Sequence, residues 1–393
     1  MQINKISILC PYEFPEGMAP TTRIVAYSKG FVQNGVTTEV ICFFPKIEQD
    51  KNPDKGKISG IKYKYINRRR NVSKFTRHLY DRPKAIINTL RYIRKSNSEK
   101  KIDLILLSFD DPLWLIIFAL PLWICRYKIA FIGDEYPEPI RKLKDNVPLR
   151  FIAGYKLAYH FIGYRILMTE ALKKFYDEKV CIKPTCILSS IVDVDRFEGV
   201  IRKEVERDYL CYMGNMMLAK DNVDNIIQAF SLIKDAHPNV DLYLYGTPVE
   251  KDLSALTDII QKLNIKNRVF IKGRVSYNEV AQILANAKVL VTSQPNTKRA
   301  EGGFPTKMAE YMMSHTPMLV TNVGEIHNYV TDNVNTFMVE PCNPVEYAAK
   351  LDFILSHNAE AMNIANQAYK DAVESFGPKN TTSRLIDFFF SQI

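Results

Sequence analysis

Short runs of β-forming residues alternate with longer amphipathic stretches along almost the whole sequence, and this alternation constrains the fold more than any other feature. The first series begins with the apolar run at residues 5–9, and the pattern restarts at residues 209–213. Strands that alternate with helices of about 10–15 residues predict parallel sheets with crossover helices. Two such series predict an α/β protein with two doubly wound, Rossmann-like domains.

The expected elements can be placed by residue number. In the first series we expect strands at 5–9, 38–44, 104–108, 129–132 and 165–168, with a helix at 21–34. In the second, strands at 209–213, 240–245, 269–272, 289–292 and 317–321 alternate with helices at 222–236, 251–263, 277–285, 305–314 and 344–355. The polar stretch at 193–208 is typical of a linker. We therefore expect an N-terminal domain over 1–195, a C-terminal domain over 205–375, and a helix within 376–393 that packs back towards the N-terminal domain.

The composition agrees with two globular domains. The chain has 393 residues, of which 47% are hydrophobic and 24% charged, which excludes a disordered or collagen-like chain. Seven cysteines are an odd number, and none has zinc-finger spacing, so we expect reduced thiols in a cytoplasmic protein. The N-terminal apolar run is too short for a signal peptide.

The longest apolar run, LWLIIFALPLWIC at residues 113–125, contains Pro121. A bilayer crossing needs about 20 residues, so this run predicts a buried helix or a helix at a membrane surface. Asp111 before Pro112 is a good N-cap for it. The same N-cap explains both acids of Ser108-Phe109-Asp110-Asp111. The spacing of these acids is wrong for a metal-binding DxD motif, so we expect no metal.

A basic stretch lies nearby. Residues 61–101 contain 14 Lys and Arg, including Arg68, Arg69 and Arg70, but only two acids. A solvated surface and a contact with an anionic membrane both explain this charge. The stretch has no aromatic-rich recognition motif, so we expect no nucleic acid partner.

The strongest functional signal is AEGGFPTKMAEY at residues 300–311, which follows a predicted strand and runs into a helix. In open α/β sheets ligands bind beyond the carboxyl ends of the strands, which places the site in a cleft between two facing domains. Gly302 and Gly303 allow close approach of the backbone, and Pro305 suits a first helical turn. The amides of Thr306, Lys307 and Met308 are expected to point outward unpaired and, with the Lys307 charge, to bind a phosphate.

Glu310 lies one helical turn beyond Thr306, where its carboxylate can accept two hydrogen bonds from a ribose diol. A second motif, YMGNMMLAKDNV at residues 212–223, places Gly214 after a strand and Lys220 before a helix. A lysine at that position can neutralise a pyrophosphate. Together the two motifs predict a site for a nucleotide diphosphate.

These motifs, with FIKGRVSYNEV, resemble the donor-binding half of glycosyltransferase family four, which has the GT-B fold. The stretches CPYEFPEGMAPTTR, GDEYPEPIR, YRILMTEALKKFY and IVDVDRF resemble the same family, so the likeness covers nearly the whole chain. The resemblance implies a cofactor-free enzyme that transfers a sugar from a UDP- or GDP-linked donor, with retention, to a glycan or lipid-linked acceptor. Surface-polysaccharide assembly at the inner membrane face would suit the basic stretch.

The resemblance also implies site residues. Lys220 matches the family lysine that contacts the diphosphate, whereas Asn215 replaces the usual arginine, and Lys307 would compensate for it. Glu310 matches the second glutamate of the family pair. Gly302 stands at the expected position of the first, with Glu301 one residue further away. The implied donor-binding residues are Gly17, Gly214, Asn215, Lys220, Arg274, Gly302, Gly303, Phe304, Pro305, Thr306, Lys307 and Glu310; the catalytic ones are Lys220, Glu301, Asp134 and Glu135; the acceptor-binding ones are Arg23 and Glu138.

Three other functions remain open at this point. A GT-B nucleotide-sugar epimerase would use a similar site without an acceptor. A dinucleotide-dependent dehydrogenase is disfavoured, because no GxGxxG motif follows a strand. A non-catalytic basic protein would bind lipid but no nucleotide sugar.

Overall fold

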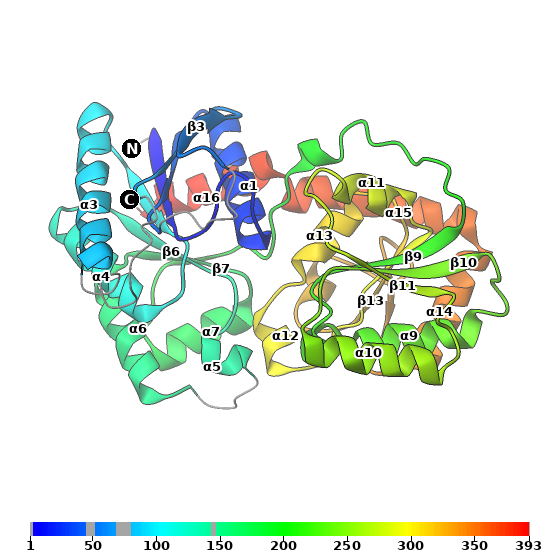
Figure 1. Ribbon diagram of the computed structural model, residues 1–393. Helices are drawn as coiled ribbons and strands as arrows, with labels where there is room; N and C mark the ends of the chain where they lie inside the picture. The colour runs from blue at the N-terminus through cyan, green and yellow to red at the C-terminus, as the bar shows by residue number, and fades with distance from the viewer. Residues whose placement is uncertain (1–2, 45–51, 68–79, 143–146, 393) are drawn as a thin grey trace. The chain divides into compact units, whose positions relative to one another are not determined.

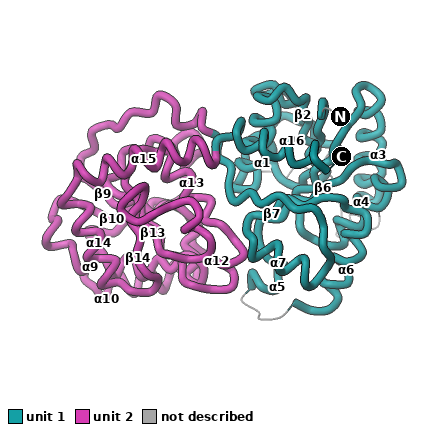
Figure 2. The backbone as a smooth tube through the Cα atoms, turned by 180° about the vertical axis from the view of Figure 1, so that it is seen from behind, with its two compact units in different colours: residues 1–193, 377–393 teal, residues 194–376 magenta. Residues whose placement is uncertain are grey.

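The structure is a computed structural model that describes residues 3–44, 52–67, 80–142 and 147–392 (Figure 1). The chain forms two compact units: unit 1 contains residues 1–193 and 377–393, and unit 2 contains residues 194–376 (Figure 2). The chain therefore passes between the units twice, once at the start of the predicted linker and once at the start of the final helix. The predicted basic triplet Arg68, Arg69 and Arg70 lies outside the described residues.

Unit 1 is built on an eight-stranded sheet with the order β3-β4-β2-β1-β5-β6-β7-β8. All neighbouring strands pair in parallel except β3, which is antiparallel to β4. The strands are β1 Lys5–Cys10, β2 Thr37–Cys42, β3 Lys55–Ile58, β4 Ile61–Tyr65, β5 Leu104–Leu107, β6 Ile129–Gly133, β7 Tyr164–Leu167 and β8 Thr185–Ile187. The helices are α1 Ala19–Gln33, α3 Arg82–Glu99, α4 Pro112–Ile124, α5 Glu138–Arg141, α6 Leu149–Phe161, α7 Glu170–Lys179 and α16 Pro378–Gln392.

The central strands of unit 1 are buried on both faces, as near-continuous apolar runs predict for a parallel sheet. In β1, Ile6 and Ile8 contribute to one hydrophobic cluster, whereas Leu9 contributes to another. Alternate residues of a strand point to opposite faces, so the two clusters lie on the two sides of the sheet.

The final helix, α16, packs against α1 within unit 1. Asn34 Nδ2 donates to the Lys379 carbonyl at 2.8 Å and to Thr382 Oγ1 at 2.9 Å. A Cβ on Gly30 would lie 2.2 Å from the Pro378 carbonyl oxygen, so the two helices approach too closely for any other residue at this position. The last residues of the chain thus belong to the same core as the first.

The long apolar run forms α4, and the predicted cap is confirmed, because Asp111 accepts a hydrogen bond from the Trp114 amide at 3.0 Å. One side of the helix is buried in unit 1, where α4 packs against α6. The other side is solvent-exposed at Leu113, Leu120, Trp123 and Ile124. Within the described residues, none of the helices combines the length and the hydropathy that a membrane crossing requires.

Unit 2 contains a six-stranded, wholly parallel sheet with the order β11-β10-β9-β12-β13-β14. The strands are β9 Asp208–Met213, β10 Val240–Tyr245, β11 Val269–Gly273, β12 Val289–Val291, β13 Met318–Thr321 and β14 Phe337–Val339. The helices are α8 Leu218–Asp221, α9 Val223–Ile233, α10 Glu250–Lys262, α11 Val280–Asn286, α12 Lys298–Gly302, α13 Thr306–Met312, α14 Pro344–Ser356 and α15 Asn358–Phe376.

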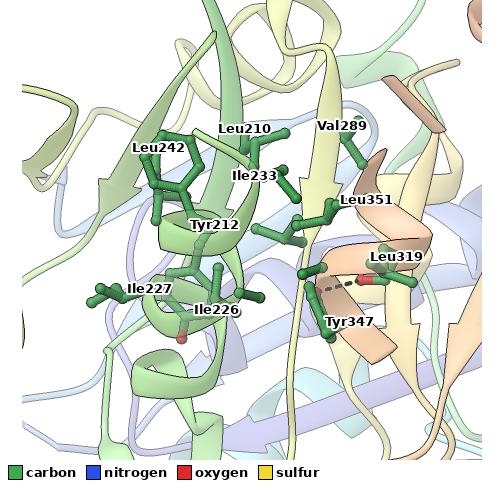
Figure 3. Close-up of a cluster of buried hydrophobic side chains, with 14 of the residues drawn as sticks. Leu210, Tyr212, Ile226, Ile227, Ile233, Leu242, Val289, Leu319, Tyr347 and Leu351 are labelled. Carbon is green, nitrogen blue, oxygen red and sulfur yellow. Dashed lines mark hydrogen bonds between the residues drawn. The ribbon is translucent and has the colours of Figure 1, made fainter. Parts of the chain in front are cut away.

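One face of this sheet packs on α9 and α10, while α11 and α13 lie on the other (Figure 1). Figure 3 shows part of the hydrophobic cluster, in which Leu210, Tyr212 and Leu242 from the strands meet Ile226 and Ile227 of α9. Helices on both faces of a parallel sheet make unit 2 a doubly wound domain. The same description holds for unit 1, so the predicted α/β class with two such domains is confirmed.

Candidate active site

The loops at the carboxyl edge of the unit 2 sheet contain most of the predicted donor-binding residues. Gly214 follows β9, Arg274 follows β11, and residues 292–305 follow β12. Because all six strands are parallel, these loops lie at one edge of the sheet. Their shared position makes this edge the candidate site of unit 2.

Two glycines bring neighbouring loops into close contact at this edge. A Cβ on Gly246, whose φ is +135°, would lie 1.8 Å from the Gly214 carbonyl oxygen. A Cβ on Gly214 would itself lie 2.6 Å from Lys307 Nζ. The loop after β9 is therefore held between the loop after β10 and the Lys307 ammonium.

The Lys307 ammonium is held by two partners at this edge. Its Nζ donates to Asp221 Oδ1 at 2.9 Å and to the Tyr212 hydroxyl at 3.0 Å. Burial alone would raise the pKa of Asp221, but Lys307, Lys220 and the Tyr212 hydroxyl outweigh it, so the pKa lies below its ordinary value of 3.8. Asp221 thus stays ionised and fixes the position of the Lys307 ammonium.

Lys220 lies in the short helix α8, next to Asp221. Its side chain is half-buried, and its charge is one of those that lower the Asp221 pKa. Asn215, in the same loop, is exposed. Lys220 therefore follows the loop after β9, on α8, and Lys307 approaches the same loop from α13.

Glu310 forms an ion pair that the sequence did not reveal. Arg196 Nη1 donates to Glu310 Oε1 at 2.5 Å, and Arg196 Nη2 donates to the Tyr277 carbonyl at 3.3 Å. Arg196 belongs to a 3₁₀ turn, Val194–Arg196, inside the segment that we predicted to be a linker. The IVDVDRF motif contained this residue, but no local pattern indicates a partner 114 positions away.

The EGGFP segment differs from the expected open loop. Thr297 caps the short helix α12, which contains Glu301 and ends at the buried Gly302, and Glu301 itself is exposed. Gly303 has extended backbone. The Phe304 ring is buried against Tyr329 and Phe376, so only the backbone of Phe304 can face a ligand.

Helix α13 begins at Thr306, with Pro305 as its N-cap. The prediction of three unpaired amides at its start is wrong for Met308, because the Met308 amide donates to the Pro305 carbonyl at 2.8 Å. A tight first turn of this kind provides an acceptor for an amide that has no partner in an ideal α-helix.

Arg299 of α12 is a further cation that sequence reasoning missed, and its Nη1 lies 3.7 Å from Met217 Sδ of the loop after β9.

Unit 1 has its own polar cluster at the carboxyl edge of its sheet. Arg23, predicted to bind acceptor, is buried in α1, where its Nη1 lies 2.9 Å from Asp134 Oδ1 after β6. Its Nη2 donates to the Tyr27 hydroxyl at 3.0 Å and to the Leu188 carbonyl at 3.2 Å. Arg23 therefore orients Asp134 rather than facing solvent.

The other acids of this edge are also paired. Arg141 donates to Asp110 at 2.6 Å and lies 3.9 Å from Glu135, while the exposed Glu138 pairs with Lys142 at 2.6 Å. Burial raises the pKa of Asp110 above its ordinary value of 3.8, against the opposing charge of Arg141. The expectation that helix capping explains both acids of the Asp110-Asp111 pair is wrong for Asp110.

Gly17 lies in the loop between β1 and α1, where a Cβ would meet Thr21 Oγ1 at 2.5 Å. No group of three or more His, Cys, Asp or Glu side chains in the described residues is arranged to hold a metal ion. The absence of a metal from the reaction stays a prediction.

These positions can now be compared with known proteins. Residues 193–371 match the family model described as glycosyl transferases, group 1. The matched residues coincide almost entirely with unit 2 and include Gly214, Lys220, Lys307 and Glu310.

Two curated proteins are similar over about half of this chain. An uncharacterized glycosyltransferase of Methanocaldococcus jannaschii is 24% identical over 193 residues, which are 49% of this chain and 47% of that protein. A poly(ribitol-phosphate) α-N-acetylglucosaminyltransferase of Staphylococcus aureus is 22% identical over 176 residues, 44% of this chain and 34% of that protein. The matches thus span less than half the length of these relatives.

Solved structures are similar over the whole chain. Sucrose-phosphate synthase from Thermosynechococcus elongatus has a TM-score of 0.73 at 12% identity, with 99% of this chain and 100% of that chain covered. Anabaena HepE in complex with UDP and glucose has a TM-score of 0.71 at 14% identity, with the same coverage. The predicted GT-B fold class, with two Rossmann-like domains, is confirmed by these neighbours.

Proposed function

We propose that this chain is a retaining glycosyltransferase that moves a sugar from a nucleotide diphosphate sugar to a hydroxyl group of a glycan or lipid-linked acceptor. The observation that carries the proposal is the position of the family match. Residues 193–371 contain the glycine loop after β9, both lysines near it and Glu310. Anabaena HepE has been solved with UDP and glucose, which supports a UDP-linked donor.

In the proposed site the diphosphate lies beside Gly214, where the backbone carries no Cβ. Lys307 is held there by Asp221, and Lys220 lies on the next helix. Glu310 accepts hydrogen bonds from the ribose, and Arg274 and the loop after β11 lie towards the base. Lys220, Lys307 and Asp221 together carry one more positive than negative charge, which favours a bound diphosphate.

The acceptor oxygen attacks the anomeric carbon while the bond from that carbon to the diphosphate oxygen breaks. The electron pair of the broken bond leaves with the diphosphate, and a phosphate oxygen takes the acceptor proton. Attack on the face from which the diphosphate departs gives retention. Lys220 and Lys307 stabilise the charge that develops on the leaving group, which is where preorganised cations lower a barrier most.

We assign acceptor binding to the carboxyl edge of the unit 1 sheet. Asp134, which Arg23 orients, and Glu135 would accept hydrogen bonds from acceptor hydroxyls or stabilise the positive charge at the anomeric carbon. Among the described residues, the ion pairs of this edge include four acids and three cations, and these acids can accept hydrogen bonds from the hydroxyl groups of an acceptor. The Staphylococcus aureus relative, by its name, transfers N-acetylglucosamine to poly(ribitol-phosphate).

We further propose that unit 1 contacts the anionic inner face of the cell membrane through α3 and α4. The exposed apolar side chains of α4 include Trp123 and Ile124, and α4 also contacts α3. Five basic residues of α3 are exposed: Arg82, Lys84, Arg91, Arg94 and Lys95. Apolar residues beside basic ones favour an interfacial site on anionic lipid.

Two assays test these proposals. In the first, UDP, GDP and ADP sugars are incubated with the protein and hydroxyl acceptors; transfer of sugar supports the enzyme, and epimerisation of donor without acceptor contradicts it. In the second, the protein is sedimented with vesicles containing phosphatidylglycerol or only phosphatidylcholine. Binding to anionic vesicles that weakens in Trp123→Ser/Ile124→Ser supports the membrane contact, and equal binding to both vesicle types contradicts it.

A further inference from the structure

Arg196 is a largely buried cation next to the candidate donor site, and none of the steps described above uses it. Its side chain is 9% exposed, whereas that of Glu310 is 25% exposed. The guanidinium carbon lies 3.8 Å from the centre of the Tyr277 ring, which is a close cation–π contact. Arg196 thus lies between two groups of unit 2, the Glu310 carboxylate of α13 and Tyr277 of the turn after β11.

The contacts of Arg196 leave one of its three guanidinium nitrogens without a hydrogen bond. Nη1 donates to Glu310 and Nη2 to the Tyr277 carbonyl. Its Nε is buried and has no hydrogen-bond partner within the described part of the chain. An unsatisfied buried donor is unfavourable, so the stacking on Tyr277 and the pair with Glu310 must outweigh it to hold the guanidinium in place.

The pair with Arg196 also restricts Glu310. Only Oε1 of the Glu310 carboxylate accepts a hydrogen bond from Arg196, so Oε2 can still accept hydrogen bonds from a ligand. A free glutamate side chain samples several rotamers, and ordering it on ligand binding has an entropic cost. A glutamate whose carboxylate is already fixed by a planar, stacked guanidinium avoids that cost.

We propose that Arg196 is a positioning residue that orients the Glu310 carboxylate towards the ribose diol and so makes the site select ribonucleotides over 2′-deoxyribonucleotides. This inference rests on the proposed function, because it takes Glu310 as the ribose acceptor. Tyr277 contributes by stacking on Arg196. The ligand class is therefore a ribonucleoside diphosphate, and the selectivity arises one contact away from the nucleotide.

The test measures dissociation constants by calorimetry for UDP, GDP and ADP, and then for the 2′-deoxy analogue of whichever binds most tightly. The variants are Arg196→Ala, Arg196→Lys, Tyr277→Leu and Glu310→Gln. Arg202→Ala is the matched control, since Arg202 lies on the same segment but forms only a half-exposed pair with Asp208 at 3.4 Å. Circular dichroism establishes that each variant is folded.

We expect the wild type and Arg202→Ala to bind the ribonucleotide about tenfold more tightly than its 2′-deoxy analogue, the effect of one lost hydrogen bond to a charged group. Arg196→Ala should bind the ribonucleotide about tenfold more weakly and lose this preference, while its affinity for the 2′-deoxy analogue changes little. Arg196→Lys and Tyr277→Leu should retain part of the preference for the ribonucleotide. If Arg196→Ala does not fold, these two variants decide the question.

The outcomes separate the inference from the proposed function. If the wild type binds none of the three diphosphates, the proposed function is wrong. If the wild type prefers ribonucleotides and Glu310→Gln does not, but the Arg196 and Tyr277 variants keep the full preference, only the inference is wrong. Tighter ribonucleotide binding by Arg196→Ala would also overturn it, because Arg196 would then compete with the ligand for Glu310.

Discussion

The carboxyl edges of the two sheets are built from the same elements but carry different charges. In unit 2 the loop after β9 packs at Gly214 against Gly246 and the Lys307 ammonium, and Lys220 lies on the helix that follows the loop. In unit 1 the corresponding edge contains Asp110 and Asp134, each paired with an arginine. In both sheets the parallel strands bring the following loops and helix starts to the carboxyl edge, so the difference lies in which side chains these segments carry.

This difference is the basis of the proposed division, with the donor at unit 2 and the acceptor at unit 1. Lysines beside the backbone of a glycine suit a diphosphate. Carboxylates held by buried or half-buried arginines suit hydroxyl groups, which donate hydrogen bonds. The two domains share one type of sheet edge, and the side chains at each edge determine which ligand it would take.

The largest expected effect is on transfer itself. Lys220→Ala and Glu310→Ala should each lower the rate by about 10²–10³-fold, as loss of a well-placed charge or acceptor does in other active sites. Both variants should remain folded, because neither side chain is part of the hydrophobic cores. The measurement is steady-state transfer with the donor that binds.

Lys234→Ala, at a surface lysine of unit 2 that pairs with its exposed neighbour Asp235, is the control and should keep the wild-type rate. Wild-type turnover in both Lys220→Ala and Glu310→Ala would refute the assignment of the donor site to unit 2.

The second effect compares two glycines. Gly246→Ala forces a Cβ to 1.8 Å from the Gly214 carbonyl and should destabilise the fold by about 3 kcal/mol or more. Gly35 in unit 1 also has positive φ, +77°, but open space around the missing Cβ, so Gly35→Ala should cost only about 1 kcal/mol. Urea unfolding measures both; equal costs would show that the Gly246 contact relaxes easily.

The third effect separates the two edges by ligand. Asp134→Asn should lower kcat/KM for the acceptor by about 10–100-fold, since it removes a charge that orients the reacting group. The dissociation constant of the nucleotide diphosphate should not change, because Asp134 belongs to unit 1. A tenfold loss of nucleotide affinity in this variant would contradict the division of labour.

The smallest effect is on the pH dependence of folding stability, which should have opposite signs at Asp221 and Asp110. The lowered pKa of Asp221 stabilises the folded protein above the ordinary value of 3.8, and this stability is lost as the pH falls through the folded-state pKa. The raised pKa of Asp110 has the opposite sign: its contribution is full below 3.8 and is lost as the pH rises through the folded-state pKa.

The melting temperature, measured against pH relative to wild type, reports both. Asp221→Asn should be most destabilised at neutral pH and approach wild type on acidification. For Asp110→Asn, the melting temperature relative to wild type should be highest at neutral pH and should decrease as the pH falls. Parallel curves for the two variants would show that their environments do not differ in this way.

Much of the fold was predictable, because its signals are local. Buried strands such as β1 are continuous apolar runs, and the start of α4 follows from Asp111 and Pro112. The short helix α12 was not predicted, because Gly302 and Gly303 favour a loop, and the only sign of the helix is the Thr297 cap that directly precedes it.

The site was predictable only in part, for the same reason. Gly214, Lys220 and Lys307 are marked by their spacing from strands and helices. Asp221 and Arg196 act through partners 86 and 114 positions away, and each looks locally like an ordinary polar residue. Pairings of this kind depend on how the sheet brings loops together, which no short pattern contains.

Hydrogen exchange measured by mass spectrometry, with and without saturating UDP, GDP or ADP, tests most directly whether unit 2 holds the nucleotide. The account predicts that at least one of the three slows exchange at residues 214–222 and 302–310, while residues 134–141 of unit 1 exchange as before. Unchanged exchange in unit 2 with all three, or slowing confined to unit 1, would contradict it.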